Sequence, residues 1–393
     1  MILLPFTRPR TGLQITTDKF CVADLHPGFG KRALRGYREH PLPANLIRLS
    51  PVEPNISNME QLVNILQSSF PGSARPQSVA LCLPDLCART TVFEFSSFPR
   101  NKKDCEALIR WRFQKDLNVS ISNSRLSYRV YHPKRGTTPA RVSGLPIRIL
   151  ATAVREDIIE SYEAACLQSG LIPVSIGLAG LAVFDFCRSA MEAALQARPQ
   201  GSSMSREDTA FLYIADWGFS FFLFREGCPV YLRAKPFRQY LPSPLPPAIS
   251  TTNSKDIAPS PPENPLADNQ PSSLLDTDSS GEPQQPHTHH VLATTVVNEV
   301  LATLQFYFET IAPTELPQHA LPLFLAGSPD PDTVFPLIEE SLQREFPEGR
   351  PGQPWITPIP LLPENPALPK KGVAALTQWT SGALSTFATA TMN

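Results

Sequence analysis

Along most of the chain, apolar residues recur with two different periods, one typical of strands and one typical of helices. The sequence therefore predicts a mixture of both. The almost continuous apolar run 78–83 predicts a buried strand, whereas the alternating run 89–95 predicts a half-exposed one. From 101 to 117, apolar residues recur at helical spacing behind Asn101, a favourable N-cap, and predict an amphipathic helix. The same patterns predict further strands at 127–131, 146–154, 172–177, 211–214, 219–224 and 322–328, and helices at 157–169, 179–194, 291–311 and 333–346, with a last helix beginning at 372.

The pattern stops between 242 and 290. Proline, serine, asparagine, aspartate and threonine dominate this segment, and large apolar residues nearly vanish from it. A segment of this composition buries too little apolar surface to offset the entropy that is lost on ordering. We therefore expect a disordered loop that interrupts the second half of the fold.

Composition limits the classes of function. A net charge of −1 over 393 residues gives no field for holding nucleic acid, so no nucleic-acid partner is expected. The seven cysteines are an odd number and form no CxxC pair, as expected for reduced thiols in a cytoplasmic protein. No apolar run approaches the ~20 residues that span a bilayer, and the run 1–6 is too short and lacks the basic flank of a signal peptide. We expect no direct membrane insertion, so that any membrane association comes through a partner.

The sequence Asp216-Trp217-Gly218 lies between two apolar strands and is the strongest candidate for chemistry. A glycine lets backbone N–H groups approach a phosphate, and a carboxylate can hold Mg²⁺ through water. The same residues are also common in ordinary hairpin turns. A phosphate clasp needs a second hairpin, and 12–25 has the strand pattern for it. In that segment, however, the neutral Gln14 and the β-branched Thr16 stand where an acid and a glycine would serve.

Several stretches then occur in a characteristic order. They are the hairpin 12–25, Leu81-Cys82-Leu83-Pro84-Asp85, the arginine-bearing helix with Trp111, the strand 150–155 with the Gly170-Leu171 that continues it, Asp216-Trp217-Gly218 and Leu325-Ala326-Gly327. In this order they resemble the actin-like ATPase superfamily and, within it, the PilM-like family of type IV pilus assembly proteins. The resemblance covers most of the chain except 242–290. The inserted α+β unit argues against the sugar kinases and heat-shock chaperones of the same superfamily.

The resemblance implies an α/β, actin-like (ribonuclease H-like) two-domain fold with an inserted small α+β subdomain. The insertion corresponds to the predicted succession of strand, helix, strand, strand and helix. The implied division is 1–94 for the first part of subdomain 1A, 95–172 for the inserted 1C-like subdomain, 173–200 for the return to subdomain 1A, 201–350 for domain 2 with its loop 242–290, and 351–393 for the C-terminal return to subdomain 1A.

In this superfamily two β-hairpins clasp the phosphates of ATP, and an acidic residue in each holds Mg²⁺ through water. By resemblance, Asp216 and Gly218 fit the second hairpin, with Asp216 as the magnesium residue. Gly327 and Ser328 stand for the glycine pair at the adenosine turn. The full candidate set for ATP and Mg²⁺ is Gln14, Thr16, Thr17, Asp216, Gly218, Gly327 and Ser328.

The first hairpin departs from the pattern of the superfamily. Gln14 stands where its Asp is expected, and Thr16 stands where its Gly is expected. The lysine of the superfamily would fall near Cys21, so a charge partner for phosphate is also missing. A slipped register would bring Asp18 or Lys19 into that role. We therefore expect ATP binding to be weak or lost, as in a pseudo-ATPase.

The resemblance also implies a partner. PilM-like proteins receive the short cytoplasmic N-terminal tail of a PilN-like inner-membrane protein beside the inserted subdomain. An extended tail could add to an open strand edge through main-chain hydrogen bonds. The candidates are Arg89, Thr91 and Phe93 on the run 89–95, and Arg110 and Trp111 on the following helix, although Trp111 also has an interpretation as a core residue and Arg110 as part of a solvated face.

The expected function is a cytoplasmic scaffold of type IV pilus assembly, or of a related secretion or competence machine, peripheral to the inner membrane through its partner. Other pilus assembly proteins are expected partners, and a homo-oligomer is left open. One alternative is an actin-like protein that binds Mg-ATP or hydrolyses it slowly. A small-molecule kinase would need a carboxylate base that faces its acceptor between the domains, and we expect no acidic residue at an obvious strand end for that role. A GspL-like secretion adaptor should carry a transmembrane helix, and no such stretch is present in the sequence.

Overall fold

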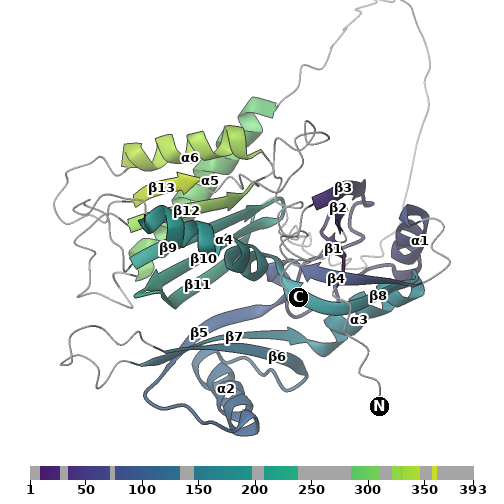
Figure 1. Cartoon of the computed structure of the whole chain (residues 1–393), viewed down its shortest axis with the longest axis horizontal. Coiled ribbons are helices and arrows are strands. Elements are labelled where there is room, and N and C mark those ends of the chain that lie inside the picture. The colour runs from purple at the N-terminus through teal and green to yellow at the C-terminus, as the bar shows by residue number, and fades with distance from the viewer. Residues whose placement is uncertain are drawn as a thin grey trace, which may run out of the picture.

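The computed structural model describes residues 9–26, 34–70, 76–132, 146–196, 208–237, 285–307, 309, 321–328, 330–345 and 356–360. In these residues the chain forms three β-sheets, two with five strands and one with three, and helices pack on their faces (Figure 1).

The first five-stranded sheet has the strand order β3-β2-β1-β4-β8. Strands β1 and β2 form an antiparallel hairpin, and β1 pairs in parallel with β4. Alternate apolar residues such as Leu13 and Leu81 belong to one core together with residues of α1 and α3. The bounds are β1 Thr11–Ile15, β2 Lys19–Leu25, β3 Leu34–Pro41, α1 Met59–Ser69, β4 Gln77–Leu83, α3 Glu156–Gln168 and β8 Leu171–Leu178.

The second five-stranded sheet has the order β11-β10-β9-β12-β13. Strands β9 and β10 form its antiparallel hairpin, and β12 pairs in parallel with β9. Helices α5 and α6 share a core with one face of this sheet. The bounds are β9 Asp208–Ala215, β10 Gly218–Arg225, β11 Cys228–Pro236, α5 Gln285–Phe306, β12 Leu321–Gly327, α6 Pro331–Glu345 and β13 Ile356–Pro360.

The small third sheet has the order β5-β7-β6 and is antiparallel throughout. Helix α2 packs on it through Ile109 and Phe113, which share a core with Phe93 and Ile149 of the sheet. The Asn101 side chain accepts the N–H of Lys103 and caps α2 as predicted. The bounds are β5 Arg89–Phe95, α2 Lys102–Leu117, β6 Ser124–Tyr131 and β7 Ile147–Arg155, and a short 3₁₀ helix η1, Asp85–Cys87, precedes β5.

Helix α4 (Ala179–Gln196) lies between the two large sheets. Its Phe184 ring stacks on Phe224 of the second sheet, with centroids 4.6 Å apart, while Ala182 shares the same core with Ala80 of the first sheet. One hydrophobic core therefore joins both sheets through α4. This arrangement brings the β1–β2 and β9–β10 hairpins toward each other (Figure 1).

The predicted strands and helices up to 346 are all present, with small differences at their ends. The helix expected at 291–311 runs from Gln285 to Phe306, so its first turns fall inside the segment expected to be a loop. Strands β3, β11 and β13 and helix α1 were not predicted. Strands β3 and β11 are largely polar or half-exposed, whereas α1 is amphipathic and was overlooked. The rest of the predicted loop and the last helix at 372 lie outside the described residues.

Candidate functional site

The turn between β1 and β2 consists of Thr16, Thr17 and Asp18. The Thr16 hydroxyl lies 3.1 Å from Asp18 Oδ1 and 2.8 Å from the carbonyl oxygen of Lys19. The Thr16 N–H donates to the same carbonyl oxygen at 2.9 Å. The polar groups of Thr16 are therefore engaged within the turn, where the superfamily would present a glycine to phosphate.

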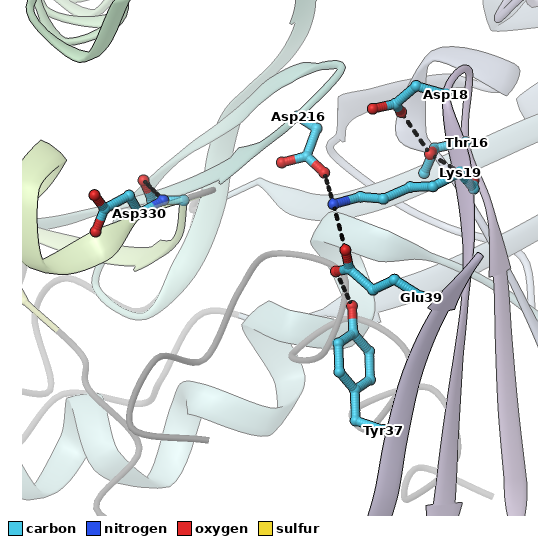
Figure 2. A network of polar contacts seen from close by, with 8 residues as sticks. Thr16, Asp18, Lys19, Tyr37, Glu39, Asp216 and Asp330 are labelled. Atoms are coloured by element: carbon cyan, nitrogen blue, oxygen red, sulfur yellow. Dashed lines mark hydrogen bonds and ion pairs between the residues drawn. The ribbon is translucent and has the colours of Figure 1, made fainter. Parts of the chain in front are cut away.

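Asp216 and Trp217 form the turn between β9 and β10, and Gly218 begins β10. A Cβ at Gly218 would lie 2.2 Å from the carbonyl oxygen of Lys235, so glycine is required for β11 to pair here. Trp217 is buried in the core that contains α4. The carboxylate of Asp216 is directed across the gap toward the first hairpin (Figure 2).

Lys19, the first residue of β2, extends from the first hairpin to Asp216 (Figure 2). Its Nζ lies 2.7 Å from Asp216 Oδ2 and 3.1 Å from Glu39 Oε2 on β3. The Tyr37 hydroxyl donates to the other oxygen of Glu39 at 2.5 Å. The side chains of Lys19 and Asp216 are only 19% and 12% exposed, so the pair is largely shielded from water. This ion pair joins the two hairpins where a phosphate clasp was expected.

Lys19 and Asp216 depend on each other for their charges. Burial raises the pKa of Asp216, because the carboxylate loses its water, and the charge on Lys19 opposes this effect. Asp18 and Glu39 raise the pKa of Asp216 further. Burial also disfavours the charge on Lys19, but the neighbouring Asp216 and Glu39 outweigh it and raise the pKa of Lys19. A charge left alone at either position would be costly, because it would be buried without its counter-ion.

The two positions at which the superfamily would have Asp and Lys in the first hairpin are both uncharged. Gln14 and Cys21 face each other across β1 and β2, and Gln14 is 1% exposed. Burial raises the pKa of the Cys21 thiol to about 12, so this thiol stays protonated near neutral pH. Lys19 lies two residues before Cys21, on the same face of β2. Of the two residues considered for a compensating role, Lys19 and not Asp18 is the one that contacts Asp216.

The predicted adenosine turn follows β12, beside the end of β9. Gly327 and Ser328 have φ values of +82° and +87°, in the left-handed region that favours glycine. A Cβ at Gly327 would lie 2.3 Å from the carbonyl oxygen of Ile214, and the Ser328 N–H donates to the same oxygen at 2.7 Å. The backbone therefore keeps a shape suited to two glycines although the second residue is serine.

The residues of the two hairpins do not fit a magnesium-bound phosphate. The Lys19 ammonium already neutralises Asp216, and Asp18 and Glu39 add two further carboxylates around it. A polyphosphate would meet three carboxylates and one ammonium that is already paired, which is an unfavourable field for an anion. In the part of the chain that the structure describes, no group of three or more His, Cys, Asp or Glu side chains could hold a metal ion. The nucleoside turn keeps its shape, whereas the phosphate half of the site does not.

The predicted partner residues on β5 have unequal surroundings. Strand β5 is an outer strand of the third sheet, as the edge prediction requires. Arg89 is exposed and Thr91 is half-buried. Phe93 is buried, and its ring lies against Phe113 of α2 with centroids 5.1 Å apart. Phe93 therefore holds the sheet against α2, and its ring is covered by the core.

The predicted partner residues on α2 also differ from each other. The guanidinium of Arg110 donates to the carbonyl oxygen of Ser124 at 3.0 Å and also to that of Ile121, so it holds the segment between α2 and β6. Trp111 is 51% exposed, and Lys115 Nζ lies 4.7 Å from the centre of its ring. The interpretation of Trp111 as a core residue is wrong, because its indole faces outward on α2.

The expectation that no acidic residue lies at an obvious strand end is wrong, because Asp85 follows the end of β4. It lies two residues beyond β4 and is buried, and its Oδ2 accepts the N–H of Gly180 at 2.7 Å at the start of α4. Burial raises the pKa of Asp85 to about 6. The sequence carried the signal, since an acid follows an apolar run at Leu83-Pro84-Asp85. The carboxylate ties β4 to the N-terminus of α4, so its contacts are those of a structural tether and not of an exposed kinase base.

The arrangement of the three sheets is similar to that of solved structures. A chain of the PilM-PilN type IV pilus biogenesis complex is 15% identical, with a match that covers 98% of this chain and 98% of that chain at a TM-score of 0.60. The present chain shares its overall fold with that chain. The predicted fold class, with two large sheets and an inserted small α+β unit, is therefore confirmed.

Two further solved structures match this chain more distantly. A Bacteroides thetaiotaomicron protein with an actin-like ATPase fold is 10% identical, covers 91% of this chain and 94% of its own, and gives a TM-score of 0.41. The ethanolamine utilization protein EutJ from Carboxydothermus hydrogenoformans is 9% identical, covers 91% and 87%, and gives a TM-score of 0.34. No protein-family model matches the sequence, and no curated protein matches it.

Proposed function

We propose that this PilM-like chain is an adaptor of a type IV pilus or related envelope machine, and that it receives the N-terminal cytoplasmic tail of a PilN-like inner-membrane protein. The observation that carries this proposal is the fold shared with a chain of the PilM-PilN complex over 98% of both chains. The paired Lys19 and Asp216 support an adaptor over an ATPase, because they leave the phosphate half of the cleft unsuited to Mg-ATP.

None of the described helices has the length and apolar character needed to cross a membrane. In the proposed arrangement, the protein stays in the cytoplasm and is held at the inner membrane by the tail of its partner. Other pilus assembly proteins and a second copy of the chain are further partners in this proposal.

Strand β5 is our candidate for the docking edge. It is an outer strand of the third sheet, and because β11, an outer strand of the second sheet, runs beside it (Figure 1), a tail added to β5 would lie between these two strands. An extended tail could add to this edge through main-chain hydrogen bonds, with side-chain contacts that give selectivity. Because Phe93 is buried and Arg110 is engaged within its subdomain, Arg89, Thr91 and Trp111 remain as the side chains that could contact the tail.

A binding measurement with a synthetic tail peptide tests the proposal. The probe is the N-terminal tail of a single-span membrane protein encoded beside this chain, carrying a fluorescent label, and the readout is anisotropy. We expect saturable binding to the wild-type protein without nucleotide. No binding at high micromolar concentration would contradict the adaptor function.

Two variants test the docking edge with a matched control. We expect Arg89→Glu and Trp111→Ala each to weaken binding by about tenfold, which corresponds to ~1.4 kcal/mol. Lys102→Glu reverses a charge on α2 at a side chain that is 85% exposed, and we expect it to bind the peptide as the wild type does. Wild-type affinity in both Arg89→Glu and Trp111→Ala would show that the tail does not dock at β5. It would not contradict the proposed adaptor function.

The alternative of Mg-ATP binding rests on the preserved turn at Gly327 and Ser328. Titration with a fluorescent ATP analogue in the presence of Mg²⁺ distinguishes the two functions. Micromolar binding that is lost in Asp216→Ala would favour the nucleotide-binding alternative.

A further inference from the structure

The position opposite Asp216 is occupied by a side chain of the protein itself. Lys19 begins β2 in the first sheet, and Asp216 follows β9 in the second, so the contact of 2.7 Å between Nζ and Oδ2 crosses from one sheet to the other (Figure 2). We propose that Lys19 is a built-in cation that replaces the metal ion of this cleft and holds the two hairpins together without any nucleotide.

The surroundings of Lys19 fix the ammonium in place. Asp216 and Glu39 contact the same Nζ, at 2.7 and 3.1 Å, and come from different sheets. Glu39 is held in turn by the Tyr37 hydroxyl at 2.5 Å. The backbone of Lys19 is also fixed, because its carbonyl oxygen accepts the N–H of Thr16 at 2.9 Å. The charged end is therefore held between two carboxylates before any ligand arrives, and its position does not depend on a bound metal.

An ammonium ion suits this environment better than Mg²⁺ does. Mg²⁺ requires near-octahedral oxygen coordination and keeps several waters, whereas the side chains of Asp216 and Lys19 are 12% and 19% exposed. The ammonium has three donors, and two of its contacts are the carboxylates described above. Because Lys19 is part of the chain, its neutralisation of Asp216 does not vary with the concentration of a free ion.

Closure by Lys19 and entry of a metal-bound phosphate exclude each other. Mg²⁺ at Asp216 would have to displace the ammonium, and Lys19 would then remain with Glu39 alone. Asp18 and Glu39 raise the pKa of Asp216, so its charge would be disfavoured whenever neither Lys19 nor a metal ion neutralised it. The cleft is therefore a constitutively closed one, in contrast to a clasp that closes only around Mg-nucleotide.

A second contact, which also consists only of groups of the protein, joins the first sheet to α4. Asp85, beyond the end of β4 in the first sheet, accepts the N–H of Gly180 on α4. A Cβ placed on Gly180 would meet both Asp85 Oδ2, at 2.8 Å, and Ser220 Cβ of the second sheet, at 2.9 Å, so all three elements come together at this point. Lys19 and Asp85 thus connect the two sheets at separate places through side chains of the protein.

Hydrogen exchange at the two hairpin turns tests the proposal in the full chain. In the wild type, we expect exchange in the segments 14–20 and 214–219 to be the same in EDTA and in millimolar Mg-ATP. In Lys19→Met, which keeps the length of the side chain and removes the charge, we expect exchange in both segments to be about tenfold faster. Lys102→Met removes an exposed lysine on α2 and should match the wild type. Exchange in β7, which lies in the third sheet, serves as an internal reference in every variant.

The double variant Lys19→Met/Asp216→Asn keeps the test decisive when Lys19→Met fails to fold. We expect the double variant to fold, because no buried charge is left without a partner, and its turn exchange to be faster than that of the wild type, because the contact between the two hairpins is lost. Slower turn exchange of the wild type in Mg-ATP would overturn the proposal. So would wild-type exchange of the two turns in Lys19→Met or in the double variant. These outcomes are independent of tail-peptide binding, which tests the adaptor function.

Discussion

Ser328 holds a backbone conformation that residues with a side chain rarely adopt. Its φ is +87°, and it is fully buried after β12. Such a conformation costs on the order of 1–3 kcal/mol in a residue other than glycine. We expect Ser328→Gly to raise the free energy of unfolding by about 1 kcal/mol, since the freedom that glycine gains in the unfolded chain offsets part of the relief. Urea unfolding measures the difference. Ser328→Ala keeps the unfavourable φ, so an equal stabilisation in that variant would contradict the explanation.

Asp85 should make the stability of the protein depend on pH in a defined direction. Burial raises the pKa of this carboxyl from 3.8 to about 6, so the folded protein binds a proton more tightly than the unfolded chain. The free energy of unfolding should therefore be highest below pH 3.8 as far as this group is concerned, and should fall as pH rises to about 6. The shift corresponds to about 3 kcal/mol. Asp216 shifts in the same direction, so it adds to the same trend.

A comparison of the wild type with Asp85→Asn isolates this contribution. The variant cannot ionise, and its amide oxygen can still accept the N–H of Gly180. We expect the difference in unfolding free energy between the two proteins to change between about pH 4 and 6 and to be constant above that range. Chemical denaturation at a series of pH values measures it, and a constant difference across the whole range would show that folding does not raise the pKa of Asp85.

Single residues of the candidate site were predictable only in part from the sequence. Asp216 and Gly218 stand out because an acid and a glycine between two apolar runs predict a turn. Gln14 and Thr16 stand out as departures from a known pattern. The pairing of Lys19 with Asp216 was not predictable, because it depends on the distance between two hairpins that are far apart in the chain. For Gly218, the sequence suggested contact with phosphate. The structure shows that a glycine is required there in any case, because a Cβ would clash with the carbonyl oxygen of Lys235.

At the scale of elements, α4 fits closely against its neighbours at Gly180. A Cβ at Gly180 would lie 2.8 Å from Asp85 Oδ2 and 2.9 Å from Ser220 Cβ. We expect Gly180→Ala to lower the free energy of unfolding by about 2 kcal/mol, because α4 would have to move away from both neighbours. Gly36→Ala on β3 is the matched control, since nothing lies within 4 Å of its added Cβ. Urea unfolding of both variants checks this, and equal effects would argue against close packing at Gly180.

Elements with a long apolar run or several apolar residues at helical spacing were mostly predicted, but the amphipathic helix α1 was missed along with the largely polar strand β3. The helix over 101–117 and the strand over 78–83 have clear apolar patterns, and both are present. Strand β3 was missed because most of its residues are polar or only partly buried. The start of α5 at Gln285 was also missed, because proline and histidine there do not have the apolar spacing of a helix. Strand β3 is held by backbone pairing with β2, and such pairing between separate segments is absent from local sequence.

At the scale of the whole molecule, α4 and a few ion pairs link three sheets. Both side-chain oxygens of Asp185 on α4 accept hydrogen bonds from Arg129 of β6 at 2.6 Å, so the third sheet is tied to the helix that joins the two large ones. Lys19 and Asp216 close the opposite side of the contact between the large sheets. The order of motifs in the sequence predicted this architecture. The ion pair between Lys19 and Asp216, which joins the two hairpins, could be found only in the structure.

Tail-peptide binding with and without nucleotide tests the idea that the protein is an adaptor whose cleft is closed by its own lysine. The dissociation constant of the labelled tail peptide is measured in EDTA, in Mg²⁺ alone and in millimolar Mg-ATP. We expect the same value in all three solutions, because Lys19 already occupies the position opposite Asp216. Binding that requires Mg-ATP, or that strengthens about tenfold or more in its presence, would contradict this view and identify a cleft that still responds to nucleotide.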